Sequence, residues 1–171
     1  DPSRAAAHYQ TVLATLPRHL EALERLAGLH TQARNWAGAV DCLHKLLQQE
    51  LPPEPRARFT LELARTYDEG LGDAGAATPL YRRALELSPG NPALVDRLVV
   101  LYERARNLPE LAQLLEAQAA GQLAVEPKRA ATLRMRAADL YAGPLPEPSR
   151  ATVLYRQVVD GDGTNLEARA V

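Results

Sequence analysis

The chain has 171 residues, of which 24% are charged and 46% hydrophobic, and these proportions are those of an ordinary soluble protein. Its net charge of −1 provides no strong field for nucleic acid or an anionic membrane surface, and no apolar run has the length of a membrane-spanning helix. Aromatic residues make up only 5%, whereas Ala, Leu and Arg are abundant, so helices are favoured over sheets.

The first 17 residues predict a single helix. Its pattern of small and aromatic residues before a proline recurs further along the chain, where Ala5, Tyr9, Val12 and Pro17 match Ala77, Tyr81, Ala84 and Pro89. The later copy is the second half of a helical pair. We therefore expect residues 1–17 to be the second helix, called helix B, of a repeat that lacks its first helix, called helix A.

Residues 18–55 predict the first complete pair, repeat 1. Apolar residues recur at i, i+3, i+4 and i+7 over residues 19–32 and again over 36–49, which is the pattern of a helix packed on one side. The proline-rich stretch 51–55 is expected to end the pair, because proline does not continue a helix interior.

Residues 56–91 form the clearest pair, repeat 2. A stripe of apolar residues precedes a glycine-rich turn at 70–73 and a second stripe follows it: Leu63, Ala64 and Tyr67, then Ala77, Tyr81 and Ala84. The pair ends at Ser88-Pro89-Gly90. Asn91 is expected to cap the next helix, and Pro92 suits its first position because the missing N–H would have no partner there.

The pattern continues over residues 92–126, repeat 3, and 127–165, repeat 4, and residues 166–171 are expected to begin a further, truncated repeat. Two successive repeats form a super-repeat, because Tyr67 recurs as Tyr141 and Tyr81 recurs as Tyr155, each 74 residues later. Repeats 2 and 4 have one more residue than repeats 1 and 3 between the two helices. Each repeat is too small to bury its own apolar face, so stability must come from stacking on neighbours.

This order of small, aromatic and proline positions resembles the tetratricopeptide repeat (TPR) family, and most closely the Ala/Leu/Arg-rich arrays of large bacterial proteins. The resemblance covers essentially the whole chain, with departures at His30, where Tyr is usual, and Leu111, where Ala is usual. It implies an all-α fold, a single α–α superhelix or TPR solenoid of antiparallel helix pairs over 1–171. It also implies that the A helices line a concave face that binds a peptide or protein.

The resemblance assigns ten residues of the A helices to partner binding. They are Glu24, Arg58, Arg65, Asp68, Asp96, Arg97, Val100, Arg104, Arg136 and Asp139. Guanidinium groups match carboxylates well, so Arg65, Arg97 and Arg104 could pair with acidic groups of a ligand. The alternative is that these arginines form local i, i+4 pairs on a solvated face. The Lys and Asn residues with which chaperone-binding members clamp a terminal carboxylate are absent from these positions.

Other residues with chemical potential favour structural interpretations. Cys42 and His44 are two positions apart on a helix, so their side chains diverge by roughly 200° and do not converge on a metal ion. The stretch 160–165 resembles the start of a calcium loop but lacks its closing Glu, so a turn is favoured. Trp36 is expected to cover the turn between two helices, the alternative being an exposed binding residue. His30 is expected to fill a position between helices.

The sequence therefore predicts a non-catalytic protein–protein interaction scaffold in a bacterial multi-component assembly, such as motility, pilus, secretion or envelope machinery. We expect no catalytic residues, no cofactor, no metal, no nucleic acid, no small-molecule substrate and no direct membrane insertion. The single cysteine suits a reducing compartment, so a cytoplasmic location is expected. The alternative is a regulatory or substrate-docking segment of a larger enzyme whose catalytic domain lies outside these residues. A third hypothesis is self-association through apolar faces at the truncated end repeats.

Overall fold

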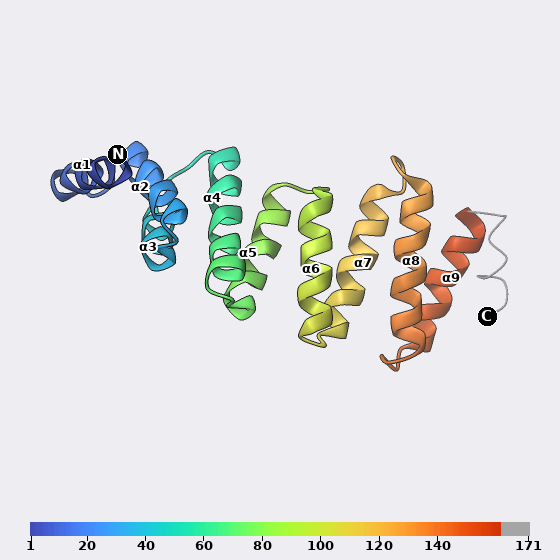
Figure 1. Ribbon diagram of the computed structural model, residues 1–171. Coiled ribbons are helices and arrows are strands. Elements are labelled where there is room, and N and C mark those ends of the chain that lie inside the picture. The colour runs from blue at the N-terminus through green and yellow to red at the C-terminus, as the bar shows by residue number, and fades with distance from the viewer. Residues whose placement is uncertain (162–171) are drawn as a thin grey trace. The chain divides into compact units, whose positions relative to one another are not determined.

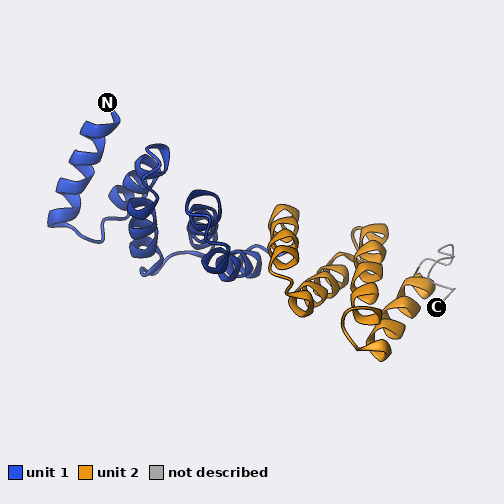
Figure 2. Ribbon diagram, turned by 60° about the horizontal axis from the view of Figure 1, so that its bottom comes forward, with its two compact units in different colours: residues 1–89 blue, residues 90–171 orange. Residues whose placement is uncertain are grey.

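The structure is a computed structural model that describes residues 1–161, and every regular element in that range is helical (Figure 1). The elements are α1 (Pro2–Thr15), α2 (Leu20–Gln32), α3 (Trp36–Leu47), α4 (Pro53–Arg65), the π-helical turn η1 (Thr66–Gly70), α5 (Ala74–Leu87), α6 (Pro92–Arg104), α7 (Leu108–Gln122), α8 (Pro127–Ala142) and α9 (Pro148–Gly161). Two compact units divide the chain, residues 1–89 and residues 90–171 (Figure 2). The division lies close to the predicted boundary between repeats 2 and 3.

Short polar residues set where several helices begin. The Asn35 side-chain oxygen accepts a hydrogen bond from the Gly38 N–H at 3.1 Å, and Asp73 accepts one from the Ala76 N–H at 2.9 Å. Each of these caps satisfies a backbone donor that has no partner inside the helix. In the second unit, Asn91 caps α6 and Pro92 is its first residue, as the sequence predicts.

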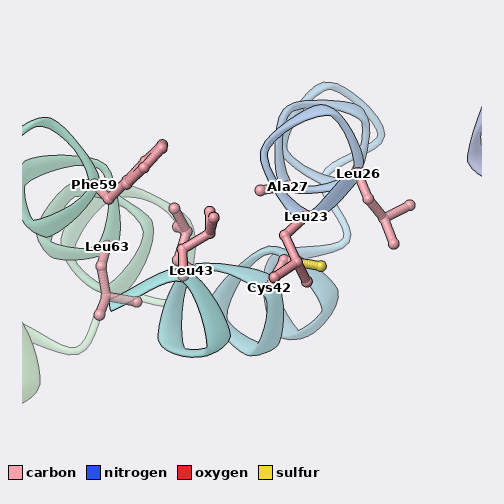
Figure 3. Close-up of a cluster of buried hydrophobic side chains, with 8 residues drawn as sticks. Leu23, Leu26, Ala27, Cys42, Leu43, Phe59 and Leu63 are labelled. Carbon is pink, nitrogen blue, oxygen red and sulfur yellow. The ribbon is translucent and has the colours of Figure 1, made fainter. Parts of the chain in front are cut away.

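The core of the first unit is shared by consecutive helices rather than enclosed within one pair. One buried cluster contains residues of α2, α3 and α4 (Figure 3): Leu23, Leu26, Ala27, Cys42, Leu43, Leu46, Phe59 and Leu63. Ala6, Tyr9 and Leu13 of α1 pack against this cluster and are partly buried. Burying a leucine side chain contributes about 1.5–3 kcal/mol. Neighbouring repeats therefore supply part of each other's stability.

Small residues allow close packing of the helices in the second unit. α8 packs against both α7 and α9. Alanines provide much of the buried surface: Ala112, Ala119, Ala130, Ala137, Ala138 and Ala151. Tyr141 is among the largest fully buried side chains, and the guanidinium carbon of Arg150 lies 4.5 Å from the centre of its ring. The alanines bring helices together where the tyrosines fill the remaining space.

The shorter turns of repeats 1 and 3 have the same backbone geometry. In each, the Asn before helix B donates its N–H to a carbonyl in helix A: Asn35 to His30 at 2.8 Å and Asn107 to Tyr102 at 2.9 Å. An arginine with positive φ precedes each Asn, 55° at Arg34 and 51° at Arg106. This is the arrangement of a Schellman motif, in which glycine is the usual residue at the positive-φ position.

The longer turns of repeats 2 and 4 also match each other. The Leu71 N–H donates to the Thr66 carbonyl at 3.0 Å to close η1, and the Leu145 N–H donates to the Leu140 carbonyl at 2.9 Å. A second bond follows in each turn: Asp73 N–H to Tyr67 carbonyl at 2.8 Å and Glu147 N–H to Tyr141 carbonyl at 3.2 Å. The extra residue is thus accommodated by one wider turn, although one sequence is rich in glycine and the other in proline.

Helix α4 begins earlier than the sequence suggests. The proline-rich stretch is expected to precede a helix that starts near residue 56, but α4 begins at Pro53. Pro53 and Pro55 lie in the first turn, where backbone N–H groups have no partner within the helix, so proline is tolerated. The expected end of the preceding helix is found, since α3 ends at Leu47.

Within residues 1–161, no helix combines the length and the hydrophobicity that crossing a membrane requires. Most of the calcium-loop-like stretch 160–165, and the predicted repeat start at 166–171, lie outside the described residues.

Candidate functional site

A groove of about 410 Å³ lies between the A helices of repeats 1 and 2, within the first compact unit. Its lining comes from α2, from the first residue of α3 and from α4 with η1: Gly28, Thr31, Gln32, Trp36, Glu62, Arg65, Thr66, Glu69 and Gly70. The site is therefore assembled from two adjacent repeats, and neither repeat forms it alone.

Trp36 forms the aromatic part of this groove. Its position follows from the cap at Asn35, which starts α3 at the tryptophan. The indole lies directly on Gly70, because a Cβ built on Gly70 would be only 2.6 Å from a ring atom. Trp36 thus covers a turn, as the sequence predicts, but the turn is η1 of the next repeat. The half-buried ring also lines the groove, so the alternative of a binding role stays open.

Two carboxylates and one guanidinium give the groove its charge, from Glu62, Glu69 and Arg65. Burial of part of the Glu62 side chain raises the pKa of its carboxyl, and the cations of Arg58 and Arg65 oppose that rise. Within the described part of the chain, no Lys, Arg or His nitrogen lies within 4.0 Å of the Glu62 or Glu69 carboxylate. The groove therefore presents negative charge that is only partly compensated.

Two predicted partner-binding arginines bridge neighbouring A helices. Arg58 of α4 donates to the Glu24 carboxylate of α2 at 2.7 Å, and Arg136 of α8 pairs with Glu103 of α6. Neither pair is the local i, i+4 type considered from the sequence. Their guanidinium groups already have carboxylate partners, so a ligand would have to compete for them.

Two predicted aspartates tie the helices of one repeat together. Asp68 accepts a hydrogen bond from the Tyr81 hydroxyl at 3.1 Å, and Asp139 accepts one from the Tyr155 hydroxyl at 2.7 Å. Burial, together with the Asp139 carboxylate, raises the pKa of Tyr155 to about 12. The tyrosine therefore stays neutral and remains the donor in this bond.

Of the ten residues predicted for partner binding, Arg65 lines the groove. On α6, Asp96 and Arg104 are exposed and Arg97 and Val100 are half-buried. The predicted set omits Trp36 and Gly70, which lie in different repeats. Their signal in the sequence is a large aromatic residue beginning one helix B and a glycine ending the next helix A.

His30 and Cys42 have structural surroundings. A Cβ on Gly38 would lie 2.8 Å from the His30 ring, so the ring fills the space between α2 and α3. Cys42 is buried in the core, and burial raises the pKa of its thiol, which disfavours the reactive thiolate. His44 is exposed and its ring contacts the Tyr67 hydroxyl at 3.2 Å, so it points away from Cys42. Among residues 1–161, no group of three or more His, Cys, Asp or Glu side chains is arranged to hold a metal ion.

No protein-family model and no curated protein matches this sequence. Solved structures do match its fold. YrrB, described as a TPR protein with an unusual peptide-binding site, is 18% identical, with 99% of this chain and 82% of that chain covered and a TM-score of 0.57. The MamA protein is 16% identical over 98% of this chain and 86% of that chain, with a TM-score of 0.57.

PilF of Pseudomonas aeruginosa is 20% identical, with 95% of this chain and 69% of that chain covered and a TM-score of 0.52. These similarities extend over nearly the whole chain, and the helix pairs, turn geometry and buried small residues agree with them. The chain has the all-α tetratricopeptide repeat fold, a solenoid type built from antiparallel helix pairs.

Proposed function

We propose that the chain is a non-catalytic protein–protein interaction scaffold that binds a peptide or protein segment on the face formed by its A helices. The groove between α2 and α4 supports this most directly. It combines an aromatic ring, hydroxyl and amide groups and charged side chains around about 410 Å³ of space. A few polar groups around an apolar wall are what fixes a ligand's position and selects it.

The similarity to YrrB, a TPR protein with a peptide-binding site, supports the same class of ligand. The proposal extends to a role within a bacterial multi-component assembly, in which this chain holds a partner through a segment seated in the groove. Binding in a preformed groove avoids part of the cost of ordering the receptor.

Filling the groove tests this proposal. A Cβ at Gly28 would have no atom within 4 Å, so Gly28→Tyr places a large side chain at the groove without disturbing the core. We expect affinity for a bound peptide to fall at least tenfold, or about 1.4 kcal/mol. The peptides come from a random 12-residue library selected on the whole chain, and affinity is measured by fluorescence anisotropy.

The matched control is Gly121→Tyr. Gly121 also lies in a helix, in the second unit, with no atom within 4 Å of its Cβ position, and it does not line the groove. We expect its affinity to stay within twofold of the unaltered chain. Equal affinity of the Gly28→Tyr variant for every selected peptide would refute the groove as the binding site.

A further inference from the structure

We propose that the groove between α2 and α4 recognises a basic side chain of its partner segment, with arginine preferred over lysine. This inference rests on the proposed function and names the chemistry of the ligand. Glu62 and Glu69 would hold the cation and Trp36 would cover it. It differs from the expectation that the arginines of the A helices bind acidic groups.

The first support is the charge of the lining. Glu62 and Glu69 contribute two carboxylates and Arg65 contributes one guanidinium, so the lining is net negative. In the described residues, neither carboxylate has a cation within ion-pair distance, whereas Glu24 next to the groove is already paired with Arg58. A ligand cation would complete the charge balance at the two carboxylates that lack partners.

The second support is the partial burial of Glu62. Removing a carboxylate from water without pairing it is unfavourable, and the raised pKa of this group reflects that burial. Such perturbed groups in a cleft are typical of binding sites, where the cost is offset when the ligand arrives. A cation seated beside Glu62 would favour its ionised form.

The third support is the corresponding place in the second unit, where the chain supplies its own cation. Arg136 lies 74 residues after Glu62, the spacing that relates Tyr141 to Tyr67 and the two long turns. Glu103 corresponds to Thr31 in the same way, through the matching short turns. Arg136 and Glu103 form an ion pair across α6 and α8. At the equivalent place in the first unit the chain has a carboxylate and a hydroxyl, and a ligand guanidinium would complete the pairing.

The fourth support is the aromatic wall. A cation within about 6 Å of a tryptophan ring is attracted to the ring face, and arginine makes such contacts more often than lysine. A planar guanidinium also presents five N–H donors, which suit two carboxylates together with the Thr31 hydroxyl and the Gln32 amide oxygen. These features favour arginine over lysine.

Two substitutions with opposite expected signs test the inference. On peptides selected from the random 12-residue library with the whole chain, Glu62→Gln combined with Glu69→Gln should weaken binding at least tenfold. Arg65→Gln should strengthen binding severalfold, because it removes a like charge next to the ligand cation. Acidification towards about pH 4 should weaken binding to the unaltered chain, because protonation removes the carboxylate charge. Circular dichroism of each variant checks that the helices are retained.

The matched control removes two carboxylates outside the groove, with Glu50→Gln and Glu86→Gln, both exposed and in the first unit. Its affinity should stay within twofold. The inference is supported if the selected peptides share an Arg or Lys at one position and replacing it reproduces the loss seen with the Glu62 and Glu69 variant.

Other outcomes separate the inference from the proposed function. Peptides that are blocked by Gly28→Tyr but are acidic or neutral, or that bind more weakly to the Arg65→Gln variant, would overturn the inference and leave the proposed function standing. A groove filled by a second copy of this chain would appear as a change of mass in sedimentation on removing Glu62 and Glu69, and would also overturn it. Failure to select any peptide, or selection only of peptides insensitive to Gly28→Tyr, would overturn both.

Discussion

Single charged residues in this chain fall into groups with different surroundings. Arg58 and Arg136 reach carboxylates on neighbouring A helices, whereas Arg65 lies in the groove. Exposed ion pairs contribute about 0–1 kcal/mol to stability, so the bridging pairs are better understood as orienting side chains between repeats than as a main source of stability. The groove carboxylates, which have no such partners in the described residues, are the groups most open to a ligand.

The pH dependence of stability should reveal Glu62 in particular. Because burial raises its pKa in the folded chain, the folded state holds this proton more tightly than the unfolded state. The contribution therefore stabilises at low pH and is lost as pH rises through the folded-state pKa. We expect Glu62→Gln to raise the free energy of unfolding at pH 7 by up to about 0.5 kcal/mol.

Urea denaturation from pH 7 down to about pH 4 measures this effect, and the difference between the variant and the unaltered chain should shrink as Glu62 becomes protonated. Glu50→Gln, at an exposed position, serves as the control. A destabilised Glu62→Gln variant at pH 7, or a difference independent of pH, would contradict the assignment.

Pairs of elements are held by turns and by close contacts that particular residues permit. The two short turns share one hydrogen-bond pattern and the two long turns share another, so the backbone geometry alternates as the repeat length does. Arg34 and Arg106 hold positive φ in the short turns without being glycine. The Tyr81–Asp68 and Tyr155–Asp139 bonds then join helix A to helix B in repeats 2 and 4.

The contact between Trp36 and Gly70 should be the most sensitive point between α3 and η1. An alanine Cβ at position 70 would lie 2.6 Å from the indole, so the ring or the turn must shift. We expect Gly70→Ala to destabilise the chain by about 1–3 kcal/mol, the usual cost of overpacking. The fluorescence of Trp36, the single tryptophan of the chain, should change with it.

Gly28→Ala provides the comparison for that prediction. Position 28 lies in α2 with nothing within 4 Å of the added Cβ. Alanine there should stabilise the helix by about 0.5–1 kcal/mol and leave the fluorescence unchanged. Equal effects of the two substitutions would mean that Trp36 does not rest on Gly70 in solution.

At the scale of the whole molecule, each compact unit depends on a core to which several helices contribute. In the first unit, Leu43 is 1% exposed and lies in the cluster formed by α2, α3 and α4. We expect Leu43→Ala to reduce the free energy of unfolding by about 2–5 kcal/mol. Amide hydrogen exchange should accelerate in α2 and α4 as well as in α3.

Leu71→Ala is the control for Leu43, because Leu71 is 48% exposed in the same unit. Its effect should be below about 1 kcal/mol. Faster exchange confined to α3 in the Leu43→Ala variant would contradict a core shared between repeats.

The sequence by itself determined the features that depend on local chemistry. The stripes of apolar residues, the capping Asn and Asp residues and the spacing of small residues specified the helices, the pairs and the alternation of turn length. The start of α4 was misjudged, because prolines that would break a helix interior are tolerated in a first turn.

Tertiary structure alone decided where the groove lies and which charges remain unpaired in it. Trp36 meets Gly70, and Arg58 meets Glu24, across two repeats. Spacing along the chain does not encode such meetings, since they depend on how closely and at what rotation neighbouring A helices pack. Helix periodicity could place Arg65 and Glu62 on the A-helix face, but only the packed helices distinguish a charge with a partner from one that is available to a ligand.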